Sequence, residues 1–370
     1  MSRLESSPLG DWWWSIDRST LYALCALALS GLVFLMSGSP AVAARLGYST
    51  FHFISRQIVF MIPTFIIMLM VSFLSLRMVR RLALIVYVIS FILVLAALKY
   101  GPLLNGAHRW IIIAGTSIQP SEFLKPAFVV LAAWAFAEGS RRKDMPGAFI
   151  ALALLPISII PLILQPDFGQ TMLITIVWCC LFFVAGLHWF WVAGLGGAGV
   201  VGIAAAYQFL PHVQTRIDRF INKSSGDTFQ VDTALEGFSQ GHWLGVGLGE
   251  GTLKRVLPDG HTDFIFAVIG EEFGVVVCLA VLAVFAFIVL RSLIMARYSA
   301  NTFCRLAITG LITMFGLQAT INMMVSVHMI PSKGMTLPFI SYGGSSLLSL
   351  ALAMGFLLAL TRKRLSVDMY

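Results

Sequence analysis

The chain has 370 residues, of which 58% are hydrophobic and only 11% are charged. This composition excludes an ordinary water-soluble domain, in which about a quarter of the residues are charged, and it suits a chain that crosses a membrane repeatedly. The net charge of +8 does not indicate a nucleic-acid partner, because the basic residues are clustered between apolar runs, which is the pattern that orients membrane proteins.

The apolar runs are long and lack the period of two that barrel strands show, so they predict helices. The expected fold is an all-α polytopic membrane protein with about ten transmembrane helices. A segment 1–19 precedes the membrane domain 20–361, and a tail 362–370 follows it. The predicted crossings are 20–37, 58–76, 82–98, 119–137, 147–164, 170–187, 189–210, 264–290, 306–329 and 341–361.

Short basic segments such as 77–81 and 141–143 alternate with loops that are poor in Lys and Arg. The positive-inside rule therefore predicts that both termini are cytoplasmic and that the polar loops face outward. The longest outer loop, residues 211–263, precedes the eighth helix, and its aromatic residues suggest that it folds back onto the membrane. Its glycine-rich run 245–251 is interpreted as a tight turn, since a phosphate loop requires a preceding strand and a suitably placed lysine.

Carboxylates mark the stretch 257–274, which begins polar and then turns apolar. Asp263 opens the eighth crossing, where it can act as a helix cap or take part in chemistry. Glu271 and Glu272 follow inside the span. Buried carboxylates in a membrane helix need partners or a water-filled cavity, so this stretch is the first candidate for a functional site.

Three further clusters lie near the outer ends of predicted helices. Glu122 and Lys125 share a helix face, either as a structural ion pair or with Lys125 facing an anionic ligand. Arg109 and Trp110 suit an interfacial anchor, or a phosphate beside a sugar face. Asp167 in the turn QPDFG is typical of an N-cap.

Two further features lie near the C-terminus. Gln318 and Asn322 are four apart on the ninth crossing, as in interhelical hydrogen bonding. Segment 341–346 suits close packing or backbone contact with a ligand. The five cysteines and seven histidines show neither disulfide nor zinc spacing. Three functions remain open: an enzyme acting on a lipid-linked anionic substrate, a transporter of such a lipid, or a scaffold.

The chain resembles the SEDS family (shape, elongation, division and sporulation) in six segments that occur in the family's order. The pair Lys333-Gly334 favours the division-type branch over the elongation-type branch. The matching segments are NGAHRWI (105–111), IQPSEFLKP (118–126), QPDFGQT (165–171), the glycine-rich run 245–251, LPDGHTDFIFAVIGEEFG (257–274) and PSKGMTLPFISYGGSS (331–346).

The resemblance implies a peptidoglycan glycosyltransferase that polymerises lipid II on the outer face of the bacterial inner membrane, enriched at the division septum. The implied partners are a class B penicillin-binding protein, which is a transpeptidase, other division proteins and membrane lipid, with no nucleic acid. A lipid II flippase and an elongation-type polymerase are the alternatives.

Particular residues match family positions. Asp263 matches the catalytic aspartate, expected to be the general base. A divalent cation, Mg²⁺ or Mn²⁺, is expected to assist the leaving group beside Asp263 or Asp167. Substrate binding is expected of Arg109, Trp110, Lys125, Arg216, Lys333 and Ser341. Support for the site is expected of Glu122, Asp167, Glu271 and Glu272.

Overall fold

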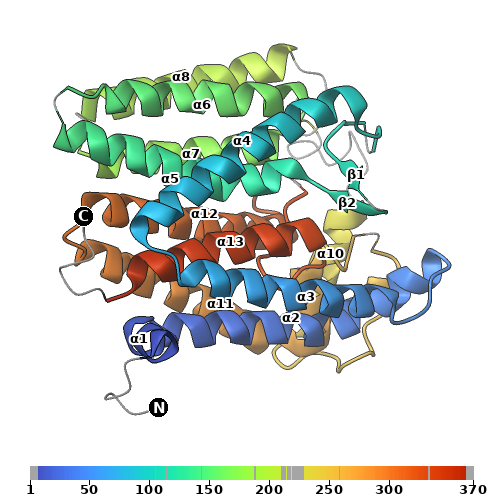
Figure 1. Cartoon of the computed structure of the whole chain (residues 1–370). Helices are drawn as coiled ribbons and strands as arrows, with labels where there is room; N and C mark the ends of the chain where they lie inside the picture. Colours follow the sequence, from blue (N-terminus) through green and yellow to red (C-terminus); the bar gives the residue numbers. More distant parts are fainter. Residues whose placement is uncertain are drawn as a thin grey trace.

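The computed structural model describes residues 7–104, 106–113, 115–142, 144–186, 189–209, 214, 218, 229–257, 259–331 and 334–363. A long helix stands at each of the ten predicted crossings (Figure 1). These helices are α2 (Arg18–Arg45), α3 (His52–Ser72), α4 (Leu76–Tyr100), α5 (Pro120–Arg141), α6 (Gly147–Leu164), α7 (Phe168–Val184), α8 (Trp189–Phe209), α11 (Ile265–Arg297), α12 (Thr302–Ser326) and α13 (Gly344–Thr361).

In the described part of the chain, eight of these helices are long and apolar enough to cross a membrane, and the apolar helix α7 is shorter, with 17 residues. The prediction of an all-α polytopic membrane protein is therefore confirmed. The remaining elements are α1 (Pro8–Ser15), α10 (Phe229–Gly241), the 3-10 turn η2 (Leu253–Arg255) and the antiparallel strands β1 (Ile111–Ile113) and β2 (Thr116–Ile118).

The two ends of the bundle differ in character. At one end, the backbone N–H of Lys363 donates to the carbonyl of Ser15 at 2.9 Å, so the first and last described turns meet. We call this the basic end; it includes residues 73–77, 138–142, 300–305 and 362. The opposite, loop end carries β1, β2 and α10, together with residues 257, 259–264, 331 and 334–343 (Figure 1, right).

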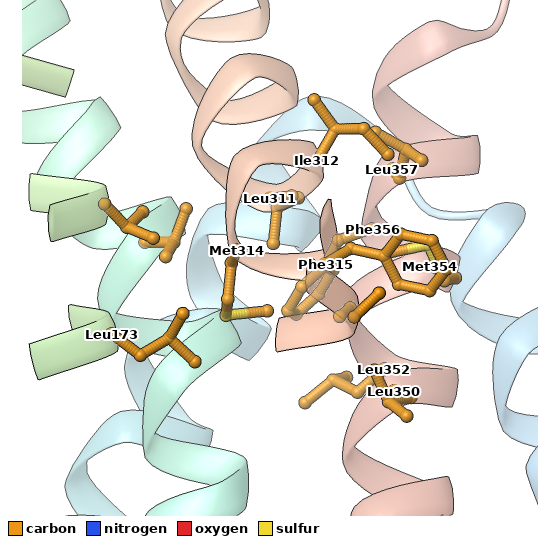
Figure 2. Close-up of a cluster of buried hydrophobic side chains, with 14 of the residues drawn as sticks. Leu173, Leu311, Ile312, Met314, Phe315, Leu350, Leu352, Met354, Phe356 and Leu357 are labelled. Carbon is orange, nitrogen blue, oxygen red and sulfur yellow. The ribbon is translucent and has the colours of Figure 1, made fainter. Parts of the chain in front are cut away.

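The core lies around α12 and α13. Nearly every residue of α13 is buried, which is the property of a helix surrounded by other helices rather than by lipid. Figure 2 shows Leu173 of α7, Phe315 of α12 and Phe356 of α13 in this cluster. In contrast, α4 exposes a row of large apolar side chains, including Leu84 and Ile85, as a lipid-facing helix does.

Helix α11 is broken at Gly274, whose backbone has φ 78° and ψ 176°. A break of this kind removes helical hydrogen bonds, and the freed groups need other partners. The glycine-rich segment supplies them: the N–H of Val246 donates to the carbonyl of Glu271 at 3.0 Å, and that of Gly247 to the carbonyl of Glu272 at 3.1 Å. The run 245–251 is therefore a turn that clamps the broken helix.

Because the glycine-rich turn packs closely against α11, position 245 has no room for a side chain. An added Cβ would lie 2.1 Å from the carbonyl oxygen of Glu272, whereas at Gly249, which also has a positive φ, nothing lies within 4 Å. We expect Gly249→Ala to cost about 1–2 kcal/mol of stability through backbone strain alone, and Gly245→Ala about 1–3 kcal/mol more through the clash. Thermal unfolding of the purified chain measures both, and equal losses would contradict the clamp.

Candidate active site

Asp263 lies in a compact turn at the loop end, two residues before α11. The N–H groups of Thr262 and Phe264 both donate to the carbonyl of Asp259, each at 3.1 Å, and so close the turn. The side chain of Asp263 is only partly exposed. The turn thus presents a carboxylate at the mouth of a membrane helix.

Segment 334–337 covers this carboxylate. Asn322 of α12 donates from Nδ2 to the carbonyl of Asp263 at 2.8 Å and to that of Met335 at 2.6 Å. A Cβ on Gly334 would lie 3.3 Å from Oδ2 of Asp263, so the glycine leaves room beside the reactive group. Within the described ranges, no side chain donates a hydrogen bond or forms an ion pair to this carboxylate.

The surroundings of Asp263 favour its protonated form. Burial, together with the negative charge of Asp259, raises the pKa of Asp263 to about 7. Nearby His261 offers no compensating charge, because burial lowers its pKa to about 4; its ring packs on Phe53 and Tyr342. A carboxyl that titrates near neutral pH and lacks a fixed partner is suited to general base catalysis.

Ser341 joins the two loops that form this site. Its hydroxyl donates to the carbonyl of Thr262 at 2.6 Å and accepts from the N–H of Leu337 at 2.8 Å. Because the side chain is buried and both bonds are internal, this geometry favours a positioning role. Its predicted contact with substrate stays a prediction.

A second polar centre surrounds Lys125 on α5. Its Nζ lies 3.0 Å from each carboxylate oxygen of Glu122 and 3.3 Å from Oε1 of Gln318. Gln170 of α7 donates to Oε1 of Glu122 at 2.6 Å. The spacing of three therefore forms a buried ion pair, and the ammonium is fully engaged inside the protein. Direct contact between Lys125 and substrate remains a prediction.

Helix α12 connects the two centres. Gln318 accepts from Lys125 and donates to the carbonyl of Thr336 at 3.2 Å, while Asn322, one turn further, holds Asp263 and Met335. Both amides therefore fix segment 334–337. The i, i+4 spacing predicted interhelical hydrogen bonds, and the bond between Lys125 of α5 and Gln318 is one; the bonds of both amides to loop carbonyls were not predicted.

Arg109, in the segment between α4 and β1, contacts the turn that precedes α7. Its Nε donates to the carbonyl of Gln165 at 3.1 Å, a second nitrogen donates to the carbonyl of Pro166, and Nη1 lies 4.0 Å from Asp167. Asp167 caps α7 by accepting from the N–H of Gln170. The guanidinium therefore braces this turn, while about a quarter of the Arg109 side chain remains exposed. Trp110, next to it, is half-buried.

Glu271 and Glu272 hold the outer loop onto α11. The carboxylate of Glu271 accepts from the N–H of Thr252 at 2.6 Å. That of Glu272 accepts from the N–H of Gly249 at 2.9 Å and also contacts Lys254 and Ser37. Neither glutamate contacts Asp263 through any bond in the described ranges, so they stabilise the loop rather than the reacting groups.

The remaining predictions concern Arg216, Lys333 and the metal. Both basic residues lie outside the described residues. Among the residues that the structure describes, no cluster of three or more His, Cys, Asp or Glu side chains forms a metal site. Mg²⁺ can bind through one or two carboxylates while water and substrate phosphates supply the other ligands, so the partly exposed carboxylate of Asp263 would be the residue to hold such an ion.

A polytopic membrane protein with an acidic site at its loop end is the class that these features define. The family model for cell cycle proteins of the FtsW, RodA and SpoVE type matches residues 18–365. The chain therefore belongs to this family, which confirms the resemblance found in its motifs.

Relatives extend along nearly the whole chain. A probable peptidoglycan glycosyltransferase FtsW from Caulobacter vibrioides is 42% identical over 98% of this chain and 93% of its own length. One of the same name from Escherichia coli is 32% identical, over 92% of this chain and 85% of its own.

Solved structures share the fold. A chain of a peptidoglycan synthase complex that coordinates polymerization and crosslinking is 26% identical, with a TM-score of 0.78 and coverage of 94% of this chain and 97% of that one. The rod shape determining protein RodA of Thermus thermophilus is 24% identical, with a TM-score of 0.70 and the same coverage.

Proposed function

We propose that this protein is a peptidoglycan glycosyltransferase that polymerises lipid II during cell division. The observation that carries the proposal is the Asp263 carboxylate at the loop end, which has no hydrogen-bond donor or counter-ion among the described side chains and a pKa of about 7, in a chain whose relatives are named peptidoglycan glycosyltransferase FtsW. The motif pair Lys333-Gly334 supports the division-type branch over the elongation-type branch.

In the proposed reaction, the carboxylate of Asp263 takes the proton from the 4-hydroxyl of the acceptor sugar. The hydroxyl oxygen attacks the anomeric carbon of the donor's muramyl unit, the configuration inverts, and undecaprenyl pyrophosphate leaves with the bonding electrons. Arg109, whose side chain is partly exposed, is proposed to bind a phosphate of the substrate, and Arg216 and Lys333 are proposed to do the same. A divalent cation would supply charge neutralisation at the leaving pyrophosphate.

The proposed setting is the bacterial inner membrane at the division septum, with both termini cytoplasmic and the loop end outside. The clustering of arginines at the basic end supports this orientation. A class B penicillin-binding protein is the proposed partner, supported by the structural similarity to a chain of a peptidoglycan synthase complex. Other division proteins are proposed to join them.

A polymerisation assay tests this function. The full-length protein, purified with its transpeptidase partner, should convert labelled lipid II into long glycan strands that a gel resolves. A flippase would move lipid II across a membrane and make no polymer. The absence of chain growth from a folded complex, with and without Mg²⁺ or Mn²⁺, would refute the proposal.

The pH dependence of polymerisation reports on Asp263 specifically. A base must be deprotonated to act, so the rate should rise with pH and level off above a midpoint near 7. Asp259→Asn removes a negative charge that helps to raise the pKa of Asp263, so the midpoint of this variant should move to lower pH while the plateau rate persists. A rate profile that Asp259→Asn leaves unmoved would argue against Asp263 as the titrating base.

A further inference from the structure

A cavity of about 920 Å³ lies between the turn 73–75, α4, α5 and the start of α12 at the basic end, at the opposite end of the bundle from Asp263. This volume is within the range of ligand sites. Its described lining includes the four arginines Arg77, Arg80, Arg141 and Arg362, and one acidic residue, Glu138. No step of the proposed reaction uses this cavity.

The charge of the cavity wall favours an anion. The carboxylate of Glu138 lies 3.6 Å from both Arg80 and Arg142, so its charge is compensated. Two helices also begin at the wall: Ser75 caps α4, and Asn301 caps α12 by accepting from the N–H of Phe303 at 3.0 Å. The positive ends of these two 25-residue helices add to the field of the arginines.

The wall is apolar as well as basic. The guanidinium of Arg80 lies over the rings of Trp134 and Phe303, at 5.6 and 5.3 Å from their centroids, and Phe73 and Leu76 line the same space. A small inorganic anion would gain nothing from these apolar side chains. A phosphate ester that carries a glycerol group and hydrocarbon chains can contact both the basic and the apolar side chains of the wall.

We propose that this cavity binds the headgroup of an anionic phospholipid. It lies at the ends of membrane-spanning helices, where headgroups are found, and basic pockets between such helices bind lipid phosphates. On the same face of α4 as Arg80, one and two turns further along, Leu84 and Val88 are exposed, which gives acyl chains an apolar surface to follow. An acidic peptide from a partner protein would match the positive charge of the arginines, but it would make no contact with this apolar surface.

Native mass spectrometry of the full-length protein, titrated with phosphatidylglycerol or phosphatidylcholine, tests the proposal. The variant Arg77→Gln/Arg141→Gln should bind phosphatidylglycerol about 20- to 30-fold more weakly, since each basic residue contributes about 1 kcal/mol. The matched control Arg81→Gln/Arg305→Gln removes two exposed charges from α4 and α12 outside the cavity lining and should bind as the unaltered chain does. The single variant Arg141→Gln, at an exposed helix end, should bind phosphatidylglycerol about fivefold more weakly. It tests the proposal even if the double variant does not fold.

Three outcomes would overturn the assignment. Equal binding of phosphatidylglycerol by the cavity variants and the control would place the lipid elsewhere. Equal binding of phosphatidylcholine and phosphatidylglycerol would remove the role of the arginines. Displacement of the lipid by an equal concentration of inorganic phosphate, or of an acidic peptide, would identify a site for that ligand instead.

Discussion

Asp263→Asn is expected to lower the rate of lipid II polymerisation by a factor of about 10²–10⁴, which is the usual contribution of a general base. The side chain keeps its size, and the hydrogen bond from Asn322 reaches the backbone carbonyl of residue 263 rather than its carboxylate. The loop therefore remains in place while the base is lost. The rate is measured with the purified full-length protein and its partner at pH 8, where the carboxylate of the unaltered protein is ionised.

The same substitution should stabilise the protein. The pKa of Asp263 is about 7 in the folded protein, whereas its ordinary value is 3.8. Between pH 3.8 and pH 7 the folded protein therefore holds a proton that the unfolded chain has lost, and the stability of the fold decreases as the pH rises through this window. Above pH 7 the unaltered protein carries a buried negative charge at Asp263, beside the charge of Asp259, and asparagine removes it. The melting temperature of Asp263→Asn should exceed that of the unaltered chain, by a margin that grows from pH 5 to pH 8.

A loss of activity together with a lower melting temperature at pH 8 would show damage to the fold rather than removal of a base. Asp259→Asn is the matched control, because it removes a carboxylate from the same turn. This control should retain activity at its plateau, in contrast to Asp263→Asn.

Lys125→Met is expected to lower stability by about 3–5 kcal/mol, because it leaves the carboxylate of Glu122 buried without its counter-ion. Both side chains of the pair are nearly inaccessible to solvent, so water cannot replace the ammonium. Methionine fills a similar volume, which limits any cavity effect. Thermal unfolding of the purified chain in detergent gives the size of the loss.

The second substitution Glu122→Gln separates charge from packing. It removes the uncompensated carboxylate, so Glu122→Gln/Lys125→Met should recover most of the lost stability. Failure of the double variant to recover would mean that Lys125 acts chiefly through Gln318 and segment 334–337, rather than through the ion pair.

Hydropathy and charge predicted the positions of all ten long helices, because lipid selects one property over about 20 residues at a time. Asp263 and the pair Glu122–Lys125 also stood out in the sequence, since charges in an apolar helix are conspicuous. The i, i+3 spacing placed both members of that pair on one face, and the structure shows the contact between them.

Other features depend on contacts between distant segments. Asn322 holds the backbone of Asp263 across 59 residues of sequence, and no local pattern indicates such a pairing. The break at Gly274 could not be predicted from the sequence either, because a glycine in an apolar run is compatible with an unbroken helix. Similarly, α13 and α4 are both apolar, yet only the packed structure shows that the first is buried and the second faces lipid.

We propose that the loop end polymerises lipid II with Asp263 as the general base. The most direct measurement is the length of glycan formed in vesicles that hold the full-length protein and its partner, with labelled lipid II accessible only to the loop end. We expect long strands from the unaltered protein and none from Asp263→Asn. Transfer of lipid II across the membrane without chain growth, or equal strands from both proteins, would contradict this proposal.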